Sequence, residues 1–538
     1  MTILEKNIQA LLSGVNEPLG NKLLNFIQNK TCSRFNIDEN LNIYDKTYNV
    51  FMYENLEEEI NFFYQSILEK TPRYPFICIY GIGNALLIKN LSKHYKHLFV
   101  FESEIELFIL ALSTIDLSEE LCSGKIYLVD IEEERVDIQL LILFDMKDMF
   151  EYLSLYEMFV NNVYYKKFYE DVWHKADELC EKNIKVVIRN LNSSLCIGFE
   201  CYSHLLQNIP SMLESIPFQR ILSERKNKFE NAIVVSAGPS LAKQLPLLKA
   251  YQDKAVIFCA DGALSMLEKE GVVPDYVTNL DFTDLAMKFF QNKENLKQSI
   301  IALECATHPN IVRSLNAENC MIVLRNKALY QRFNLNDFGY IDTGTHVSHF
   351  SYTLALALGF KNIIMIGQDL AFDEEGNSHS KGFDFGEKFS GEENIDKLKV
   401  TAYAGKGEVL THITWNDYRI KLEYLFACND QKAKFYNATE GGARINFTEE
   451  LSFKECCEKL LTKEKPQFEL PKSLTKNRSD KLLVKFKEKI QKDQENAKRF
   501  LDDALALKQI LENILSKDFI LPLEFLEKVY QNIENFNH

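Results

Sequence analysis

Small and polar residues follow five apolar, strand-like segments of this sequence, and such residues bind phosphates, riboses and sugar hydroxyls. The first segment runs into Ser236-Ala237-Gly238-Pro239-Ser240. Small side chains let backbone N–H groups approach a ligand, proline fits the first position of a helix, and a helix N-terminus favours an anion. The turn therefore predicts a phosphate site completed by the Ser236 and Ser240 hydroxyls, although a strand-to-helix turn without a ligand has the same pattern.

The residues that follow the other four segments carry carboxylate, amide and hydroxyl groups. These groups of residues, called tips below, lie after a predicted strand or before a predicted helix. They are Asp261-Gly262, Asn279 with Asp281, Thr343-Gly344-Thr345, and Gly367-Gln368-Asp369. Because ligands of parallel sheets lie outside the carboxyl ends of the strands, we expect these tips in one crevice. The alternative is that the aspartates only cap the helices that follow, which contributes about 1 kcal/mol each.

A histidine lies just past the last of these tips. A histidine at the position of His379 can take a proton from a hydroxyl near neutral pH. We predict catalytic roles for His379, Asp281 and Asp369. His346 and His349, one helical turn apart near a predicted helix start, compete for the role of the base, and both also fit packing along a buried helix face.

Strands and helices alternate through residues 211–452, which carry all five tips. The predicted strands are NAIVVSAG (231–238), AVIFCAD (255–261), YVTNLD (276–281), SIIALEC (299–305), MIVLRN (321–326) and NIIMIGQD (362–369). Apolar strands separated by helical segments are typical of a doubly wound, mostly parallel sheet with helices on both faces. The expected fold class is therefore α/β, with residues 211–452 as the catalytic domain.

Residues 1–210 and 453–538 flank this domain. In the first part the predicted strands are FICIYG (76–81), HLFVFE (97–102), KIYLVD (125–130), IQLLILF (138–144) and IKVVIRN (184–190), which indicates an N-terminal α/β domain. The Gly81-Ile82-Gly83-Asn84 turn and Glu102 have the order of a nucleotide-binding unit but lack its third glycine. We expect a structural role, with a dinucleotide or methyl-donor site as the alternative. In residues 453–538, apolar residues recur at helical spacing between charged ones, which predicts a C-terminal helical domain. Its apolar stripe would serve packing within the chain, oligomer formation or the binding of a partner.

Composition narrows the class of protein. The 538 residues carry 62 basic and 77 acidic side chains, a net charge of −15, which argues against a nucleic-acid binder. The 12 cysteines are scattered without zinc-site spacing, so buried thiols in a reducing compartment are expected. The start of the chain lacks the pattern of a signal peptide, and no apolar run approaches the ~20 residues of a membrane span. We therefore expect a cytoplasmic protein without membrane insertion.

Four segments of the central domain carry a resemblance to a known family. VVSAGPSL (234–241), CADGALSMLEKEGVVPDYVTNLD (259–281), DTGTHVSHFSYTLALALGFKNIIMIGQDLAF (342–372) and HSKGF (379–383) resemble the motility accessory factors. That family is implicated in placing nonulosonic acids on flagellin. The resemblance implies a glycosyltransferase that takes pseudaminic or legionaminic acid from a CMP-activated donor, requires no cofactor, and meets flagellin in the cytoplasm before export.

The same domain is more distantly similar to bacterial sialyltransferases that use a CMP-activated sugar. Their Gly-Asn-Gly-Pro-Ser-Leu turn corresponds to residues 236–241, with Ala237 in place of the asparagine. Their Thr-Ser-Gly helix start corresponds to Asp342-Thr343-Gly344, and their Ser-Gly-Ile-Asp strand end to residues 366–369. The similarity implies that these segments hold the CMP portion, and their His-Ser-Lys base motif matches His379-Ser380-Lys381.

Two other functions remain open. The Asp-Gly, Pro-Asp and Asn-Leu-Asp elements within 261–281 also resemble pyrophosphokinases that act on thiamin or a pterin, in which Asp261 and Asp281 would hold Mg²⁺. Asn279 stands where a second acidic residue would strengthen such a site. The long C-terminal stripe would suit a non-catalytic flagellin chaperone, but a chaperone needs no polar crevice.

Overall fold

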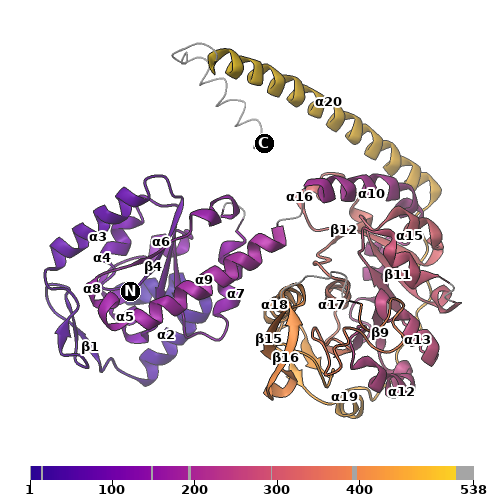
Figure 1. Ribbon diagram of the computed structural model, residues 1–538, viewed down its shortest axis with the longest axis horizontal. Coiled ribbons are helices and arrows are strands. Elements are labelled where there is room, and N and C mark those ends of the chain that lie inside the picture. The colour runs from indigo at the N-terminus through magenta and orange to yellow at the C-terminus, as the bar shows by residue number, and fades with distance from the viewer. Residues whose placement is uncertain are drawn as a thin grey trace. The chain divides into compact units, whose positions relative to one another are not determined.

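The computed structural model describes residues 2–13, 16–146, 149–191, 195–291, 294–389 and 397–515. Contacts divide the chain into two compact units, Met1–Ser194 and Leu195–His538, called unit 1 and unit 2 below. Figure 1 colours unit 1 from indigo to magenta and unit 2 from magenta to yellow. The expected α/β class is confirmed, since each unit contains a parallel sheet with helices around it. The three-part division at residues 210 and 452 stays a prediction.

Unit 2 is built on one nine-stranded sheet in which every pairing is parallel. In order across the sheet, the strands are β13 (Gly339–Ile341), β12 (Cys320–Arg325), β11 (Ile300–Glu304), β10 (Tyr276–Asn279), β9 (Val256–Ala260), β8 (Asn231–Val235), β14 (Asn362–Ile366), β17 (Lys434–Asn437) and β18 (Glu449–Glu450). The six predicted central strands are all present. An antiparallel hairpin, β15 (Lys397–Thr401) with β16 (Glu408–His412), lies apart from this sheet and was not predicted.

Alternating residues of each central strand enter two different cores. Ile233, Val235 and Ile257 belong to one core, and Ala232 and Val234 belong to the other. The first core is completed by α10 (Leu195–Glu214), α12 (Leu241–Tyr251), α13 (Leu264–Glu270), α14 (Met287–Phe290), α15 (Pro309–Ser314), α16 (Ala328–Gln331) and α19 (Phe453–Leu460), and the second by α11 (Phe218–Arg225), α17 (Val347–Ala357) and α18 (Ile413–Ala427). Burial on both faces explains why the strands are nearly continuous apolar runs.

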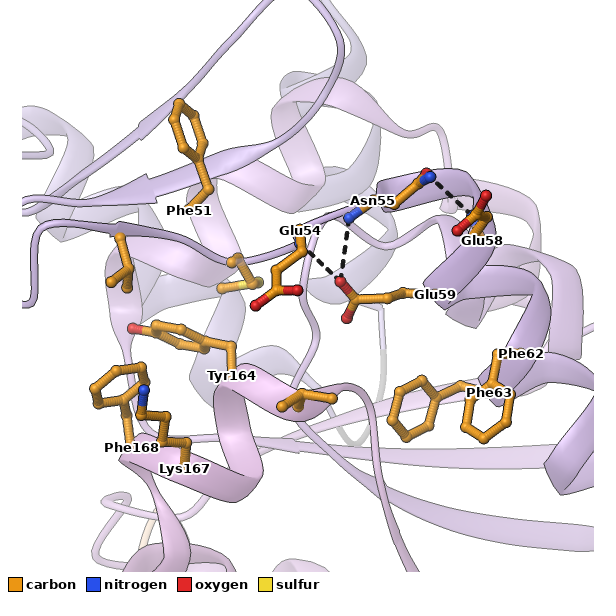
Figure 2. Close-up of a pocket in the computed structure, with 13 residues that line it drawn as sticks. Phe51, Glu54, Asn55, Glu58, Glu59, Phe62, Phe63, Tyr164, Lys167 and Phe168 are labelled. Atoms are coloured by element: carbon orange, nitrogen blue, oxygen red, sulfur yellow. Dashed lines mark hydrogen bonds between the residues drawn. The ribbon is translucent and has the colours of Figure 1, made fainter.

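Unit 1 has a smaller parallel sheet and an antiparallel one. The first has the order β6 (Ile126–Asp130), β5 (His97–Glu102), β4 (Phe76–Tyr80), β7 (Met158–Val160), and the second β1 (Phe35–Ile37), β2 (Ile43–Asp45), β3 (Val50–Phe51). The helices are α1 (Ile3–Leu11), α2 (Glu17–Asn29), α3 (Leu56–Lys70), α4 (Leu86–Leu91), α5 (Ile105–Thr114), α6 (Ser118–Cys122), α7 (Val136–Phe144), α8 (Val163–Phe168) and α9 (Glu170–Leu191). A pocket opens between β3, α3 and α8 (Figure 2).

Two predicted strands of unit 1 are helices instead. Residues 138–144 lie in α7 and residues 184–190 in α9. The apolar run in α7 is buried on most sides, so its pattern does not distinguish a helix from a strand. In α9, the buried residues Ala176, Cys180, Ile184 and Val187 recur at helical spacing, which overrides the local β-branched run.

The C-terminal helix begins as part of unit 2. In α20 (Lys476–Leu515), Phe486 is buried in the first core, and Leu482, Leu483 and Ile490 pack against it. Farther along, Leu501 and Leu505 are exposed. Within the described ranges, no helix is long and apolar enough to cross a membrane.

Candidate functional site

The sheet of unit 2 reverses its direction of growth between β8 and β14. These strands are neighbours, although β9 to β13 lie between them in the sequence. The chain adds β9 to β13 on one side of β8, and then adds β14, β17 and β18 on the other. In open α/β sheets such a switch point opens a crevice at the carboxyl ends of the strands, where ligands bind.

The turns that follow β8 and β14 touch each other at this point. The Gly238 N–H donates to the Gly367 carbonyl over 2.8 Å. A Cβ on Gly238 would lie 2.5 Å from that carbonyl oxygen and 2.1 Å from a carboxylate oxygen of Asp369. Gly367 has φ +63°, and its Cβ would meet the Ser236 carbonyl oxygen at 2.2 Å. The small residues of both turns are therefore needed for the turns to pack together, whether or not a ligand binds.

Asp369 lies at the N-terminus of α12, where the sequence predicted a phosphate. Its carboxylate accepts a hydrogen bond from the Ser240 hydroxyl at 2.8 Å and from the Ser240 N–H at 3.3 Å. The next free N–H of this helix start, at Ala242, donates to the Ser380 hydroxyl at 3.0 Å. Burial raises the pKa of Asp369 to about 6, and the bonds from Ser240 lower it in part. The N-terminus of α12 is thus capped by a carboxylate of the protein itself, that of Asp369.

A pocket of 120 Å³ occupies the crevice between the two turns. Five predicted residues line it together with Trp415 and Ser378: Ser236, Gly238, Gln368, Asp369 and His379. Pockets that enclose a ligand of drug size have volumes of about 300 Å³ or more. This pocket by itself is therefore too small to enclose a ligand of that size.

His379 presents a defined tautomer to this pocket. The Ser378 hydroxyl lies 2.9 Å from the Glu387 carbonyl oxygen, 2.5 Å from the Phe389 carbonyl oxygen and 2.9 Å from His379 Nδ1. Since carbonyl oxygens only accept, the hydroxyl proton points to them, and Nδ1–H must donate to the hydroxyl. The lone pair is then on Nε2. Burial lowers the pKa of His379 to about 4, so the ring is neutral at pH 7.

Neighbouring side chains hold the imidazole of His379 and the side-chain amide of Gln368 in place. The His379 ring stacks on Phe383, with centroids 3.9 Å apart and an interplanar angle of 8°. The Gln368 side-chain oxygen accepts from the Ser236 hydroxyl at 2.9 Å and from the Tyr352 hydroxyl at 3.3 Å. Tyr352 belongs to α17, so that helix helps to fix the tip of β14.

The tips of β9 and β10 form a second polar group. The Asn279 amide donates to Asp261 at 2.6 Å, and the Gly262 N–H donates to the same carboxylate at 2.7 Å. Burial raises the pKa of Asp261 to about 7; the Asn279 bond opposes this rise and the charge of Asp281 adds to it. A Cβ on Gly262 would lie 3.6 Å from the Ala237 Cβ, so this group borders the switch-point turn.

Asp281 is more accessible than Asp261. It accepts from the Thr283 N–H at 2.9 Å and from the Thr283 hydroxyl at 2.8 Å. This is the pattern of a local turn cap. The residue is half-buried at the end of β10.

Polar atoms without partners gather at the start of α17. Thr343 Oγ1, His346 Nε2 and His349 Nδ1 are buried and have no hydrogen-bond partner in the described part of the chain. Gly344 has φ +66°, and a Cβ there would lie 2.3 Å from the His349 ring. Burial lowers the pKa of His349 to about 4 and holds that of His346 well below its usual value, so both rings are neutral. Eight of the predicted site residues lie outside the lining of the pocket between the β8 and β14 turns, called the switch-point pocket below: Pro239, Ser240, Asp261, Gly262, Asn279, Asp281, Thr343 and Gly344.

Three residues of the site region were missed in the sequence. Trp415 lines the pocket from α18, and Ser378 sets the tautomer of His379. Gln244 accepts from the Gly367 N–H at 3.2 Å and thereby supports the β14 turn from α12. None of these residues lies at the tip of a strand of the parallel sheet, so the pattern of strand tips gave no signal for them.

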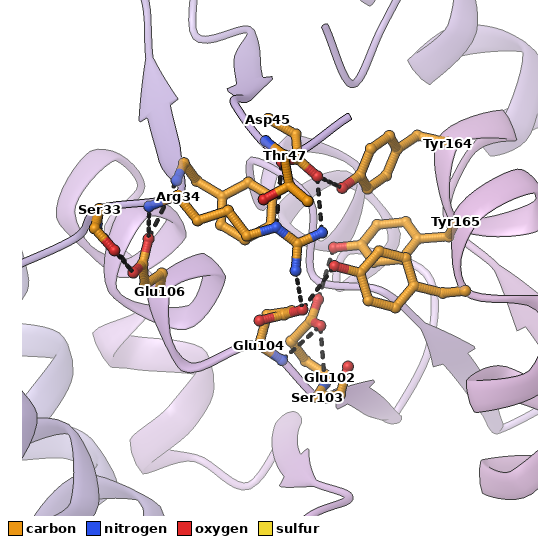
Figure 3. A network of polar contacts seen from close by, with 12 residues as sticks. Ser33, Arg34, Asp45, Thr47, Glu102, Ser103, Glu104, Glu106, Tyr164 and Tyr165 are labelled. Atoms are coloured by element: carbon orange, nitrogen blue, oxygen red, sulfur yellow. Dashed lines mark hydrogen bonds and ion pairs between the residues drawn. The ribbon is translucent and has the colours of Figure 1, made fainter. Parts of the chain in front are cut away.

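The glycine turn of unit 1 is filled by the protein itself. The Gly83 N–H donates to the Tyr165 hydroxyl at 3.1 Å, and the Asn84 N–H points to the Tyr53 hydroxyl at 3.4 Å. The Tyr165 hydroxyl donates to Glu102 at 2.6 Å (Figure 3), and Glu102 also accepts from the Ile82 N–H at 3.2 Å. Tyr165, Tyr53 and Glu102 thus bind the backbone N–H groups of this turn, and the structural role expected from the sequence stays a prediction.

Comparisons with known proteins reach part of this chain. A family model described as 6-hydroxymethylpterin diphosphokinase MptE-like matches residues 203–375, which include the turns after β8, β9, β10 and β14. A solved structure of a Maf glycosyltransferase from Magnetospirillum magneticum AMB-1 is similar with a TM-score of 0.43 and 16% identity, over 90% of this chain and 78% of that one. No curated protein matches the sequence.

Proposed function

We propose that this protein is a glycosyltransferase that moves a nonulosonic acid, of the pseudaminic or legionaminic type, from a CMP-activated donor to serine or threonine of flagellin. Modification would precede export in the cytoplasm and serve flagellar assembly and motility. The observation that supports it is the switch-point pocket, where a neutral His379 with its lone pair on Nε2 lines the same space as Gln368 and Asp369.

We also propose how the parts of the donor are distributed, and the contacts of the two helix starts support this proposal. Asp369 already caps α12, so a phosphate there would meet a like charge. At the start of α17, Thr343, His346 and His349 offer partnerless polar atoms next to a helix N-terminus. In this proposal the donor phosphate would bind at the start of α17, the ribose or cytosine at the Asp261–Asn279 pair, and the sugar in the pocket beside His379.

The reaction needs one proton acceptor and stabilisation of a departing phosphate. The acceptor hydroxyl oxygen forms a bond to the anomeric carbon of the sugar, and the bond between that carbon and the phosphate oxygen breaks, so CMP leaves with the electron pair. His379 Nε2 takes the hydroxyl proton, while the dipole of α17 stabilises the charge on CMP.

The test combines purified full-length protein, a CMP-nonulosonic acid and flagellin monomer. We expect CMP release together with a mass increase of flagellin by one sugar. His379→Gln should lower the rate about 100-fold or more, while His94→Gln, an exposed histidine of unit 1, should leave it unchanged. Because the pKa of His379 is about 4, activity should fall only as pH approaches 4, rather than near 6.5. CMP release that is equal in His379→Gln and in the unchanged protein would remove His379 from the mechanism.

A pyrophosphokinase is the second candidate, because the matching family model is described as a pterin diphosphokinase and covers Asp261 and Asp281. Two features make it weaker: Asp261 is already bonded to Asn279 and Gly262, and its raised pKa disfavours the charged form that Mg²⁺ needs. AMP formation from ATP and a hydroxymethylpterin, abolished by EDTA and restored by Mg²⁺, would replace our proposal. Sugar transfer that largely survives EDTA would support it.

A further inference from the structure

The pocket of unit 1 has no role in the proposed reaction, although its volume is 550 Å³. That volume is in the range of known ligand sites. Its walls come from β3, the first turns of α3, and α8 (Figure 2). Apolar and acidic side chains and one lysine, Lys167, line it, with Phe51, Phe62 and Val163 on the apolar part.

The apolar residues at the mouth of this pocket are unusually exposed. Phe62 is 66% exposed, Val163 57% and Phe51 52%. Beyond the pocket, Tyr48 continues this surface, because its ring stacks on Phe168 with centroids 4.3 Å apart. An exposed aromatic surface of this kind marks an interaction site. Since the surface continues past the pocket, its occupant is a chain rather than a single small molecule.

The three glutamates of the pocket, Glu54, Glu58 and Glu59, outnumber its one lysine, Lys167, so the acidic part favours a cation. Figure 2 shows the carboxylates of Glu54 and Glu59 pointing toward one another above the residues of α8. One Glu59 oxygen accepts from the Glu54 N–H at 2.7 Å, whereas the other is buried without a partner. Over the ranges that the structure describes, no basic side chain forms an ion pair with Glu54 or Glu59. A lysine or arginine of the occupant would supply the missing donor.

The wall opposite these carboxylates is fixed by the polar network of unit 1 (Figure 3). The Tyr164 hydroxyl donates to Asp45 at 2.6 Å, and Arg34 bonds to the same carboxylate at 2.8 Å and to Glu104 at 2.6 Å. These bonds tie α8 to β2 and, through Arg34, to the start of α5. The pocket is therefore largely formed before anything binds, which reduces the entropic cost of binding.

We infer that this pocket binds a polypeptide segment in which a lysine or arginine lies between apolar side chains. The inference rests on the proposed function in one respect: the segment would belong to the acceptor protein, so the pocket would select the protein that is modified. The cation would lie between Glu54 and Glu59, and the apolar neighbours would cover Phe62 and Val163.

Charge exchange gives the sharpest test. Two short fluorescent peptides would be compared by anisotropy on the full-length protein, one with lysine between leucine and phenylalanine, and the other with glutamate in place of lysine. We expect the lysine peptide to bind at least about tenfold more tightly. Glu54→Lys should reverse the preference, and Phe62→Ser should weaken both peptides by about tenfold. There are two matched controls. Glu57→Lys lies in the first turn of α3 outside the pocket lining, and Phe199→Ser replaces an exposed residue of unit 2. Neither control should change the affinity for either peptide.

The outcomes separate this inference from the proposed function. Release of CMP in the absence of flagellin reports donor chemistry alone, and Glu54→Lys should leave it unchanged. The same variant should raise the KM for flagellin at least about fivefold, with kcat kept. Equal binding of both peptides, or an unchanged preference in Glu54→Lys, would overturn the inference even if CMP is released. Binding of anionic lipid vesicles in place of the lysine peptide would overturn it as well.

Discussion

At the scale of single residues, the buried carboxylate of Asp369 determines a pH dependence. Its pKa is raised from 3.8 to about 6, so the stability that it contributes is fully present below pH 3.8 and is lost as pH rises through about 6. Asp369→Asn removes this titration. Urea unfolding at pH 4, 6 and 8 should show the unfolding free energy of the variant, relative to the unchanged protein, increasing by roughly 2–3 kcal/mol from pH 4 to pH 8.

The matched control for this measurement is Asp284→Asn, since Asp284 is exposed. Its unfolding free energy relative to the unchanged protein should stay constant with pH. A difference for Asp369→Asn that is equally constant would mean that Asp369 titrates normally.

Asp281 allows a residue-scale test of function against packing. Its bonds to Thr283 are those of a cap, so Asp281→Asn should cost only about 1 kcal/mol of stability. Under the proposed function the Asp281 carboxylate accepts a hydrogen bond from a hydroxyl of the CMP-activated sugar. We therefore expect flagellin glycosylation by the variant to fall at least about tenfold, while its circular dichroism spectrum stays unchanged. Near-normal glycosylation would leave Asp281 as a cap only.

At the scale of elements, the contact between the turns after β8 and β14 is the most constrained feature. Gly238→Ala places a Cβ 2.1 Å from Asp369 and 2.5 Å from the Gly367 carbonyl oxygen, so the turns must separate. We expect a loss of about 3 kcal/mol in unfolding free energy. Gly198→Ala is the control, because a Cβ at this helix position meets nothing within 4 Å; it should be neutral or stabilise by up to ~1 kcal/mol. Equal melting temperatures of the two variants would contradict this.

The elements of unit 2 could be predicted better than those of unit 1 for a physical reason. Strands such as β8 and β9 are buried on both faces and end in turn residues. The length of the apolar run and the turn residues that follow it therefore both predict a strand. In α7 and α9 the apolar runs resemble strands, and only tertiary burial decides for a helix. Likewise, the glycines near Asp369 predicted a ligand contact, yet what they contact is another turn, which one sequence does not reveal.

At the scale of the whole molecule, the structure indicates where the C-terminal helix can be cut. A deletion that starts at Ser479 would remove Phe486 from the core of unit 2, so loss of flagellin binding would be ambiguous. A chain that ends at Glu495 keeps Phe486, Ile490 and the ion pair of Arg332 with Asp493. We expect its melting temperature to change little, while flagellin capture in a pull-down weakens because the exposed Leu501 and Leu505 are gone. Capture equal to that of the full chain would exclude this end of the helix as a contact.

The tyrosines in the glycine turn of unit 1 have a consequence for stoichiometry. Because the chain has two parallel sheets, each with a glycine turn after a strand, one could expect it to bind two nucleotides per molecule. Tyr165 and Tyr53 already hold the N–H groups that a second nucleotide would need. A calorimetric titration with CMP should therefore saturate at one equivalent, and a photoreactive cytidine analogue should label peptides of unit 2 alone.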